Sequence, residues 1–308
     1  MPTRRYGRYT VEADNLDKLF FPDAGVTKGD LIEYYERVAD RILPFLKDRP
    51  ISMERRPDGM DGEGFYQKKA PDTFPDWVDT TPVKLRQGGR ERQVVCNKKA
   101  TLALLAEQGC ITPHPWLSRT GALDRPDRMI IDLDPPSEDF APVRDAARRL
   151  RDLLEEVRLK PFLMLTGSKG AHVVVPLDRS ARFDTVRRFA QDAAKFLAEK
   201  HPDELTTEQR KKKRGRRVFL DTARNAYGQT GVPPYAVRSR KGAPVAAPIR
   251  WNELSRGSLR SANYNTRNLF RRLANLDDPW KGMGRSARSL EEPRQRLDDL
   301  ISREADSG

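Results

Sequence analysis

The sequence predicts an α+β protein in which strands and helices are mixed rather than strictly alternating. Short apolar runs bounded by Gly, Pro or Asp are typical of strands, whereas longer amphipathic stretches are typical of helices. Both kinds occur along the whole chain without a regular strand–helix order, and no internal repeat is present. This pattern argues against a doubly wound parallel sheet.

The chain is strongly basic. Its 58 Lys and Arg residues against 45 Asp and Glu residues give a net charge of +13 at pH 7. Such a surplus indicates a nucleic acid or another polyanion as partner, although a generally basic proteome would give the same balance. Cys96 and Cys110 are too few for a disulfide framework, and no apolar run reaches membrane-spanning length. We therefore expect a cytoplasmic protein with no membrane partner.

The first third of the chain is predicted to hold one long helix and several short strands. Thr27 is expected to cap the helix, with Asp30 as the acidic partner in its first turn. Apolar side chains recur at helical spacing over residues 31–45, so this helix buries one face. Gly88-Gly89 indicates a hairpin turn. Strands are expected over residues 51–55, 83–86 and 93–96, and a second helix over residues 99–107.

A pair of carboxylates follows the next predicted strand. Residues 128–131 are apolar or long side chains, Asp132-Leu133-Asp134 comes next, and Pro135-Pro136 stops the strand. Because side chains i and i+2 of a strand share one face, Asp132 and Asp134 project the same way. Oxygen ligands so arranged suit Mg²⁺ or Mn²⁺, because a cation between them relieves their repulsion. A solvated strand end that begins a turn is the alternative interpretation.

A third carboxylate, Asp221, ends another apolar run at residues 218–220. Three acidic groups from two strand ends can hold two divalent ions, as in-line phosphoryl transfer requires. This interpretation demands that Asp221 converge with Asp132 and Asp134 in the fold, although the sequence separates them widely. The alternative role for Asp221 is to cap a helix that begins near Thr222.

A glycine-bearing turn lies between two apolar runs, residues 162–165 and 173–175. In Thr166-Gly167-Ser168-Lys169-Gly170, backbone N–H groups, hydroxyls and a lysine can meet a phosphate. His172 begins the next strand, from which its imidazole can reach the same pocket. The spacing is not that of a P-loop, and an ordinary hairpin with a capping serine is the alternative.

Aromatic rings and positive charges lie together in Phe65-Tyr66-Gln67-Lys68-Lys69. Exposed rings can stack on bases of any sequence while lysines contact phosphate; one core ring and one edge ring would be the structural alternative. The like charges of residues 210–217 predict a solvated, mobile loop that contacts nucleic-acid backbone. Its cations include Lys211, Lys212, Lys213 and Arg216. Further candidates for phosphate contacts, with surface ion pairing as the alternative, are Arg224, Arg238 and Arg240.

The last part of the chain is charged and predicted to be mainly helical. Strands are expected over residues 235–240 and 245–250, and Trp280 is a late apolar anchor. Long helices are expected earlier, over residues 142–157 and 184–200. We predict that residues 1–254 form one domain and that residues 255–308 form a charged helical C-terminal extension.

In combination and order, these motifs resemble the polymerase domain of the bacterial end-joining ligase (ligase D) and its stand-alone primase-polymerase relatives. These proteins belong to the archaeo-eukaryotic primase superfamily. The resemblance runs from Asn15 to Leu254. Asp132-Leu133-Asp134-Pro135 is similar to the family's metal-binding strand, and residues 166–172 are similar to its triphosphate-binding segment. Phe219-Leu220-Asp221 is similar to the strand of the third carboxylate, and His114-Pro115-Trp116 to a histidine motif that lines the active site.

The resemblance implies a primase-type catalytic core, two β-sheets flanked by helices, with the active site between the sheets. It assigns Asp132, Asp134 and Asp221 as catalytic ligands of two Mn²⁺ or Mg²⁺ ions. It implies contact with the nucleoside triphosphate substrate for Phe65, Tyr66, His114, Thr166, Ser168, Lys169, Gly170, His172, Arg224 and Arg238. It implies that Lys18 and Lys28 hold a DNA 5′-phosphate, while Lys68 and the basic run contact the DNA backbone.

The resulting hypothesis is a template-directed nucleotidyltransferase that fills short gaps or extends primers at DNA double-strand breaks in non-homologous end joining. The resemblance implies a preference for manganese and ribonucleotides, and gapped or broken duplex DNA with a 5′-phosphate as substrate. It also implies a Ku-type end-binding protein and a DNA ligase as partners, with association to the bacterial nucleoid. A metal-dependent nuclease or phosphoesterase, and a non-catalytic DNA-end-binding module, are the alternatives.

Overall fold

The computed structural model describes residues 2–85 and 87–307 and confirms the α+β class. Arg86, at which the sequence predicts a strand to end, lies outside the described residues. The chain forms two compact units, each assembled from separate stretches. Unit 1 comprises residues 1–123, 230–247 and 264–275, and unit 2 comprises residues 124–229, 248–263 and 276–308. This division does not test the boundary at residue 254, which stays a prediction.

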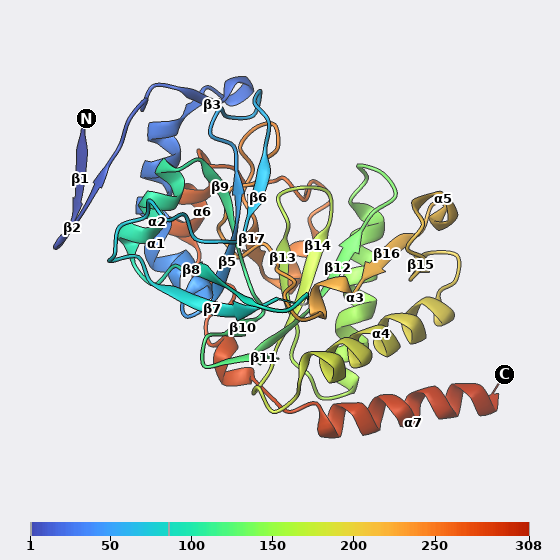
Figure 1. Ribbon diagram of the computed structural model, residues 1–308. Helices are drawn as coiled ribbons and strands as arrows, with labels where there is room; N and C mark the ends of the chain where they lie inside the picture. Colours follow the sequence, from blue (N-terminus) through green and yellow to red (C-terminus); the bar gives the residue numbers. More distant parts are fainter. Residues whose placement is uncertain (1, 86, 308) are drawn as a thin grey trace. The chain divides into compact units, whose positions relative to one another are not determined.

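Unit 1 is built on a five-stranded sheet (Figure 1). The strand order is β6 (Phe65–Gln67), β5 (Pro50–Arg55), β8 (Arg90–Val95) and β7 (Thr80–Lys84), and β9 (Cys110–Pro115) also pairs with β5. The helices of this unit are α1 (Lys28–Leu46), α2 (Lys99–Glu107) and α6 (Leu269–Asn275). Short ladders join β1 (Thr3–Tyr6) to β2 (Tyr9–Glu12) and β3 (Leu19–Phe21) to β4 (Val26–Thr27). A further ladder joins β10 (Ser118–Arg119) to β11 (Ala122–Pro126), a strand that continues past the end of this stretch of unit 1 at residue 123.

Helix α1 begins where the sequence predicts. The Thr27 side chain accepts a hydrogen bond from the Asp30 backbone N–H at 3.1 Å, and Asp30 accepts one from the Thr27 N–H at 2.8 Å. This reciprocal pair satisfies N–H groups that the first turn of a helix would leave without partners. Leu31, Tyr35 and Ile42 are buried on the face that the helical spacing predicts, and α1 packs on α2.

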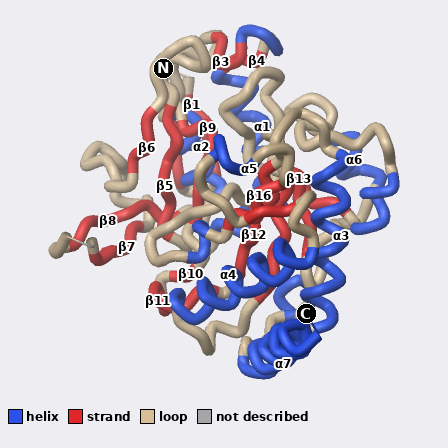
Figure 2. Tube along the Cα trace, turned by 90° about the vertical axis from the view of Figure 1, so that its right-hand side faces the viewer, coloured by secondary structure: helices blue, strands red, loops and turns tan. Residues whose placement is uncertain are grey.

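Unit 2 is built on a six-stranded sheet with α-helices packed against it (Figures 1 and 2). The strand order is β15 (Leu205–Thr206), β16 (Val218–Asp221), β12 (Arg128–Asp134), β14 (Ala171–Pro176), β13 (Phe162–Leu165) and β17 (Ala247–Ile249). The helices are α3 (Ala141–Glu156), α4 (Phe183–Lys200), α5 (Lys211–Arg214) and α7 (Glu291–Ser307). Strand β12 is antiparallel to both of its neighbours, which agrees with the expectation that the sheet is not doubly wound.

The region beyond residue 254 contributes to both units, with α6 in unit 1 and α7 in unit 2. The Trp280 indole N–H donates a hydrogen bond to the Leu163 carbonyl on β13 at 3.0 Å, so this predicted anchor is attached to the sheet. Helix α7 packs on α4, and Arg294 forms an ion pair with Asp192 at 2.5 Å. In the part of the chain that the structure describes, no helix is both long and apolar enough to span a bilayer.

The strand predicted over residues 235–240 is wrong. That segment follows two prolines, and Tyr235 has a φ of 69°, in the left-handed region that interrupts an extended chain. Only an isolated bridge pairs Val237 with Val245, and the second predicted strand is shortened to β17.

Candidate active site

Three carboxylates converge on one face of the six-stranded sheet. Asp132 on β12 lies directly opposite Asp221 on β16 in the antiparallel register, and Asp134 lies opposite Phe219. Directly opposed residues share a face, as do residues i and i+2 of one strand. The register therefore places Asp132, Asp134 and Asp221 on the same side, which is the convergence that the metal-site hypothesis demands.

The carboxylate cluster carries an unfavourable accumulation of negative charge. The pKa of the Asp134 carboxyl is raised to about 6, first by burial and then by the charges of Asp132 and Asp221. Two nitrogen-bearing side chains face Asp132: His172 Nε2 lies 3.4 Å from its Oδ2 atom, and Arg224 Nη2 lies 4.0 Å from the same atom. Neither approach is a short, charge-assisted hydrogen bond, so the cluster still favours an added cation.

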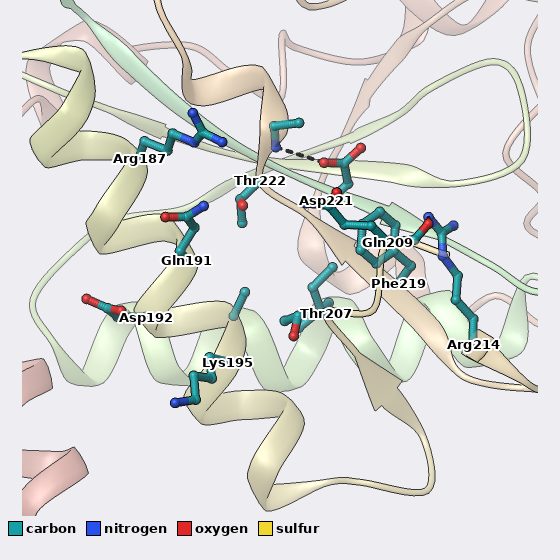
Figure 3. A pocket seen from close by; sticks show the side chains of 13 residues that line it. Arg187, Gln191, Asp192, Lys195, Thr207, Gln209, Arg214, Phe219, Asp221 and Thr222 are labelled. Carbon is teal, nitrogen blue, oxygen red and sulfur yellow. Dashed lines mark hydrogen bonds between the residues drawn. The ribbon is translucent and has the colours of Figure 1, made fainter. Parts of the chain in front are cut away.

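The donor set fits a hard divalent cation, although the side chains are not arranged around one. Among residues 2–85 and 87–307, no group of three or more His, Cys, Asp or Glu side chains is positioned to hold a metal ion. Asp221 directs Oδ1 at the Ala223 backbone N–H at 2.8 Å, as the dashed line in Figure 3 marks. Asp221 thus caps the turn after β16, which is the alternative role that the sequence offers for it. In the strand ladder it still lies opposite Asp132. A rotation of the Asp221 carboxylate would free it as a ligand.

The predicted phosphate-binding turn is tightly hydrogen-bonded. The Thr166 hydroxyl donates to the Gly170 carbonyl at 3.0 Å and accepts from the Ser168 N–H at 3.3 Å. A residue that sequence reasoning missed, Ser261, donates to the same Gly170 carbonyl at 2.6 Å and lies 3.2 Å from the Thr166 hydroxyl. Ser261 is buried and lies far along the chain, and no motif around it signals this contact.

The turn is also pressed against the strand of the carboxylates. A Cβ atom on Gly170 would lie 1.9 Å from the Leu133 carbonyl oxygen, so only glycine fits there. His172 lies opposite Asp132 in the ladder between β12 and β14. Its Nδ1 atom is buried and has no hydrogen-bond partner among the residues that the structure describes. Lys169 forms an exposed ion pair with Glu138 at 2.6 Å, so its ammonium group already has a carboxylate partner.

Unit 1 carries the predicted aromatic and histidine residues. Tyr66 is 64% exposed and Phe65 is 46% exposed, which favours the stacking interpretation over a buried ring. The ring centroid of Tyr66 lies 5.6 Å from that of His114, and Lys68 is exposed nearby in sequence. Arg238 is half-buried in the same unit, with its backbone N–H bonded to the Pro244 carbonyl at 2.8 Å.

His114 has an acidic partner that sequence reasoning missed. Its Nε2 atom lies 3.2 Å from Glu54 Oε2. Burial alone would raise the pKa of the Glu54 carboxyl, but its hydrogen bond with His114 and the His114 charge outweigh burial and hold this pKa at about 2. Because Glu54 stays ionised, it orients the imidazole beside Tyr66.

The two lysines that the resemblance assigns to a 5′-phosphate have different environments. Lys18 forms an ion pair with the exposed Asp58 at 2.5 Å. Lys28 is only 6% exposed and bonds to both Asp14 at 2.6 Å and the buried Glu107 at 2.8 Å. Lys28 therefore has a structural partner, and phosphate binding by either lysine stays a prediction.

Part of the basic run of residues 210–217 is helical, whereas the sequence predicts a loop. Lys211–Arg214 forms the short helix α5. Arg214 donates to the Glu208 and Gln209 carbonyls at 2.9 Å and lies over the Phe219 ring, 3.7 Å from its centroid. The loop prediction is wrong for residues 211–214, where the stacked Arg214 anchors the run, and the mobility of the run stays a prediction. Most other cations of the run are exposed, as predicted, namely Arg210, Lys211, Lys212, Lys213 and Arg216, whereas Arg217 is partly buried.

Comparison with known proteins bears on the family and the fold. The family model described as "LigD, primase-polymerase domain" matches residues 27–280. The chain is 35% identical over 275 residues to the multifunctional non-homologous end joining protein LigD of Pseudomonas aeruginosa. This alignment covers 88% of the chain and 32% of the Pseudomonas protein. The chain is also 35% identical over 247 residues to the bifunctional LigD of Bacillus subtilis, in an alignment that covers 79% of the chain and 39% of the Bacillus protein.

A solved structure extends the likeness to three dimensions. The polymerase domain of Mycobacterium tuberculosis ligase D, solved in complex with DNA, matches with a TM-score of 0.84 and 29% identity. The match covers 90% of this chain and 99% of that one, whereas the chain spans only about a third of the length of its full LigD relatives. The fold is thus of the archaeo-eukaryotic primase type. From its motifs, its fold and these matches, the chain belongs to the LigD primase-polymerase domain family, a family of nucleotidyltransferases.

Proposed function

We propose that this chain is a template-directed nucleotidyltransferase that fills short gaps or extends primers at DNA double-strand breaks during non-homologous end joining. The observation that carries the proposal is the strand register. It sets Asp132 opposite Asp221 on one side and opposite His172 on the other, with Gly170 packed on the same strand. Carboxylates for cations and a turn suited to phosphates thus meet along one strand.

In the proposed reaction, the 3′-oxygen of a growing strand forms a bond to the α-phosphorus of a nucleoside triphosphate. The bond from that phosphorus to the bridging oxygen breaks, pyrophosphate leaves, and the hydroxyl proton passes to solvent. Divalent cations held by Asp132, Asp134 and Asp221 would supply the neutralising charge at this step. The family resemblance supports Mn²⁺ as the preferred ion and ribonucleotides as preferred substrates.

The chain's own groups bind and orient the triphosphate. The Ser168 hydroxyl and the backbone N–H groups of its turn that are not bonded to Thr166 or Gly170 donate to phosphate oxygens. Arg224 adds positive charge beside Asp132, and the His172 imidazole lies next to the same carboxylate. When the triphosphate binds, the Lys169 ammonium group leaves its ion pair with Glu138 and contacts a phosphate instead. Because that ion pair is exposed, its loss costs at most about 1 kcal/mol.

Unit 1 would contact bases and DNA. We assign stacking on the template base and incoming nucleotide to Phe65 and Tyr66, whose exposure supports it. His114 and Arg238 would contact the nucleotide, and Lys18 and Lys28 the 5′-phosphate of a downstream strand. The basic residues over 211–216 and Lys68 would contact the DNA backbone. A Ku-type protein and a separate DNA ligase activity are the proposed partners, and location at the nucleoid stays a prediction.

The test is primer extension by Asp132→Ala on a gapped duplex with Mn²⁺. The variant should lose extension while retaining most of its DNA affinity, because Asp132 acts on the reaction and not on duplex binding. Asp203→Ala, which removes an exposed carboxylate from the same unit, is the matched control and should extend normally. Undiminished extension by Asp132→Ala would refute the assignment. Shortening of end-labelled DNA without nucleotides would instead support a nuclease.

A further inference from the structure

A cavity that adjoins the carboxylate cluster at Asp221 opens along the edge of β16, and we call it the β16-edge cavity. Its volume is about 430 Å³, within the usual range of pockets for small ligands. Residues of α4, of the segment 207–214 and of β16 line it, and Asp221 is part of its wall (Figure 3). All of these residues belong to unit 2.

The cavity exists because the neighbouring strand is short. Strand β15 pairs with β16 only through Leu205 with Val218 and Thr206 with Phe219. The last residues of β16, Leu220 and Asp221, therefore have no β15 partner beside them. Leu220 and Asp221 point to opposite faces of the strand, yet both line the cavity, so the cavity wraps the strand edge and reaches the face that carries the carboxylates.

The charges around this cavity favour an anionic ligand. Arg187 lines it from α4, and it has no hydrogen bond or ion pair with any residue in the ranges 2–85 and 87–307. Among the described residues, Lys195 has only an exposed contact with Glu199 at 3.6 Å, whereas the acidic Asp192 is already bound by Arg294. An arginine without a partner beside a cavity is suited to a phosphate.

Neutral polar groups complete the wall. Figure 3 shows Arg187 and Gln191 extending from α4 toward Thr222, just after β16. Amides and hydroxyls of this kind bind the oxygens of sugars and phosphodiesters without adding charge. These neutral lining residues are Gln191, Thr207, Gln209 and Thr222.

The strand order indicates whether the attacking hydroxyl or the leaving group lies on the β16 side of β12. The turn of residues 166–170 joins β13 to β14, on one side of β12, whereas β16 and the cavity lie on the other side. In an in-line displacement, the attacking oxygen and the leaving group occupy opposite sides of the phosphorus. If the turn holds the departing pyrophosphate, the attacking hydroxyl must arrive from the side of β16.

We propose that the β16-edge cavity binds the 3′-terminal nucleotide of the strand being extended. Arg187 holds its phosphodiester, the neutral groups contact its sugar, and its 3′-hydroxyl lies beside Asp221. This assignment rests on the proposed function, because it takes the direction of attack from the triphosphate turn. It adds a binding site on α4 that none of the motifs indicates.

The first test compares Arg187→Ala with Arg188→Ala, which removes an arginine from the next position of the same helix and does not line the cavity. The substrate is a primer–template with a recessed 3′ end. Arg187→Ala should raise the KM for this DNA about tenfold, as expected for one lost charge-assisted hydrogen bond. Its KM for nucleotide and its melting temperature should not change, and Arg188→Ala should match the parent protein. An unchanged KM for DNA in Arg187→Ala would overturn the proposal.

The second test locates the primer end directly and does not depend on turnover. A primer ending in a photoreactive 4-thiothymidine is bound to the unmodified protein without nucleotide, irradiated, and mapped by mass spectrometry. Cross-links should fall within residues 187–195 or 207–223, and cross-links confined to other segments would overturn the proposal. If the protein cross-links there but never extends a primer, the proposed function fails while the binding site stands. If it extends primers but cross-links elsewhere, only the site assignment fails.

Discussion

Replacing Gly170 by alanine should damage both the stability of unit 2 and nucleotide binding. The added Cβ would lie 1.9 Å from the Leu133 carbonyl oxygen, whereas ordinary contacts begin at 3.4 Å. Leu133 is fully buried, and β12 is held by ladders on both sides, so neither strand can move without breaking hydrogen bonds. We expect a loss of about 3 kcal/mol in the free energy of unfolding, at the upper end for overpacked cores.

Urea denaturation followed by circular dichroism measures this loss, and initial rates of primer extension measure the KM for nucleotide. The KM should rise, because the displaced turn no longer presents Ser168 and Lys169 together. Gly257→Ala is the matched control in the same unit, since its Cβ would meet no atom within 4 Å. It should change the stability by no more than about 0.5 kcal/mol. Parent-like stability and KM in Gly170→Ala would refute the steric reasoning.

Three further substitutions probe contacts described above. Ser261→Ala removes a hydrogen bond to the Gly170 carbonyl, which should cost about 1 kcal/mol in urea denaturation and raise the KM for nucleotide; an unchanged KM would remove its positioning role. Glu138→Gln releases Lys169 and should lower that KM by at most about fivefold, whereas a higher KM would contradict the proposed exchange. Lys28→Ala leaves Glu107 buried without its cation, so thermal and urea denaturation should show a loss of about 3 kcal/mol; parent-like stability would contradict this.

The sequence predicts features that depend on local spacing. The capping box of Thr27 and Asp30 is visible because both partners lie within one helical turn. The shared face of Asp132 and Asp134 follows from the two-residue period of a strand. The metal-site hypothesis requires Asp221 to converge with this pair, but no spacing rule predicts that convergence, because the pairing of distant strands depends on the whole sheet.

Contacts between distant side chains could not be predicted from spacing at all. Ser261 reaches the phosphate turn only because the chain returns to unit 2 after residue 247. The ion pair of Lys28 with Glu107 buries a lysine that the resemblance assigns to a DNA 5′-phosphate. Tyr235 shows the opposite failure, because its left-handed φ overrides an apolar pattern that favours a strand.

The hydrogen bonds of Ser261 and Trp280 set an order for assembly during synthesis. Protein chains emerge from the ribosome N-terminus first. The strands that carry Asp132, Asp134 and Asp221 are all complete before either residue emerges. The phosphate turn gains its Ser261 support later, and β13 gains its Trp280 anchor later still. A nascent chain can therefore pair the strands of its carboxylates before Ser261 and Trp280 brace the triphosphate turn and β13.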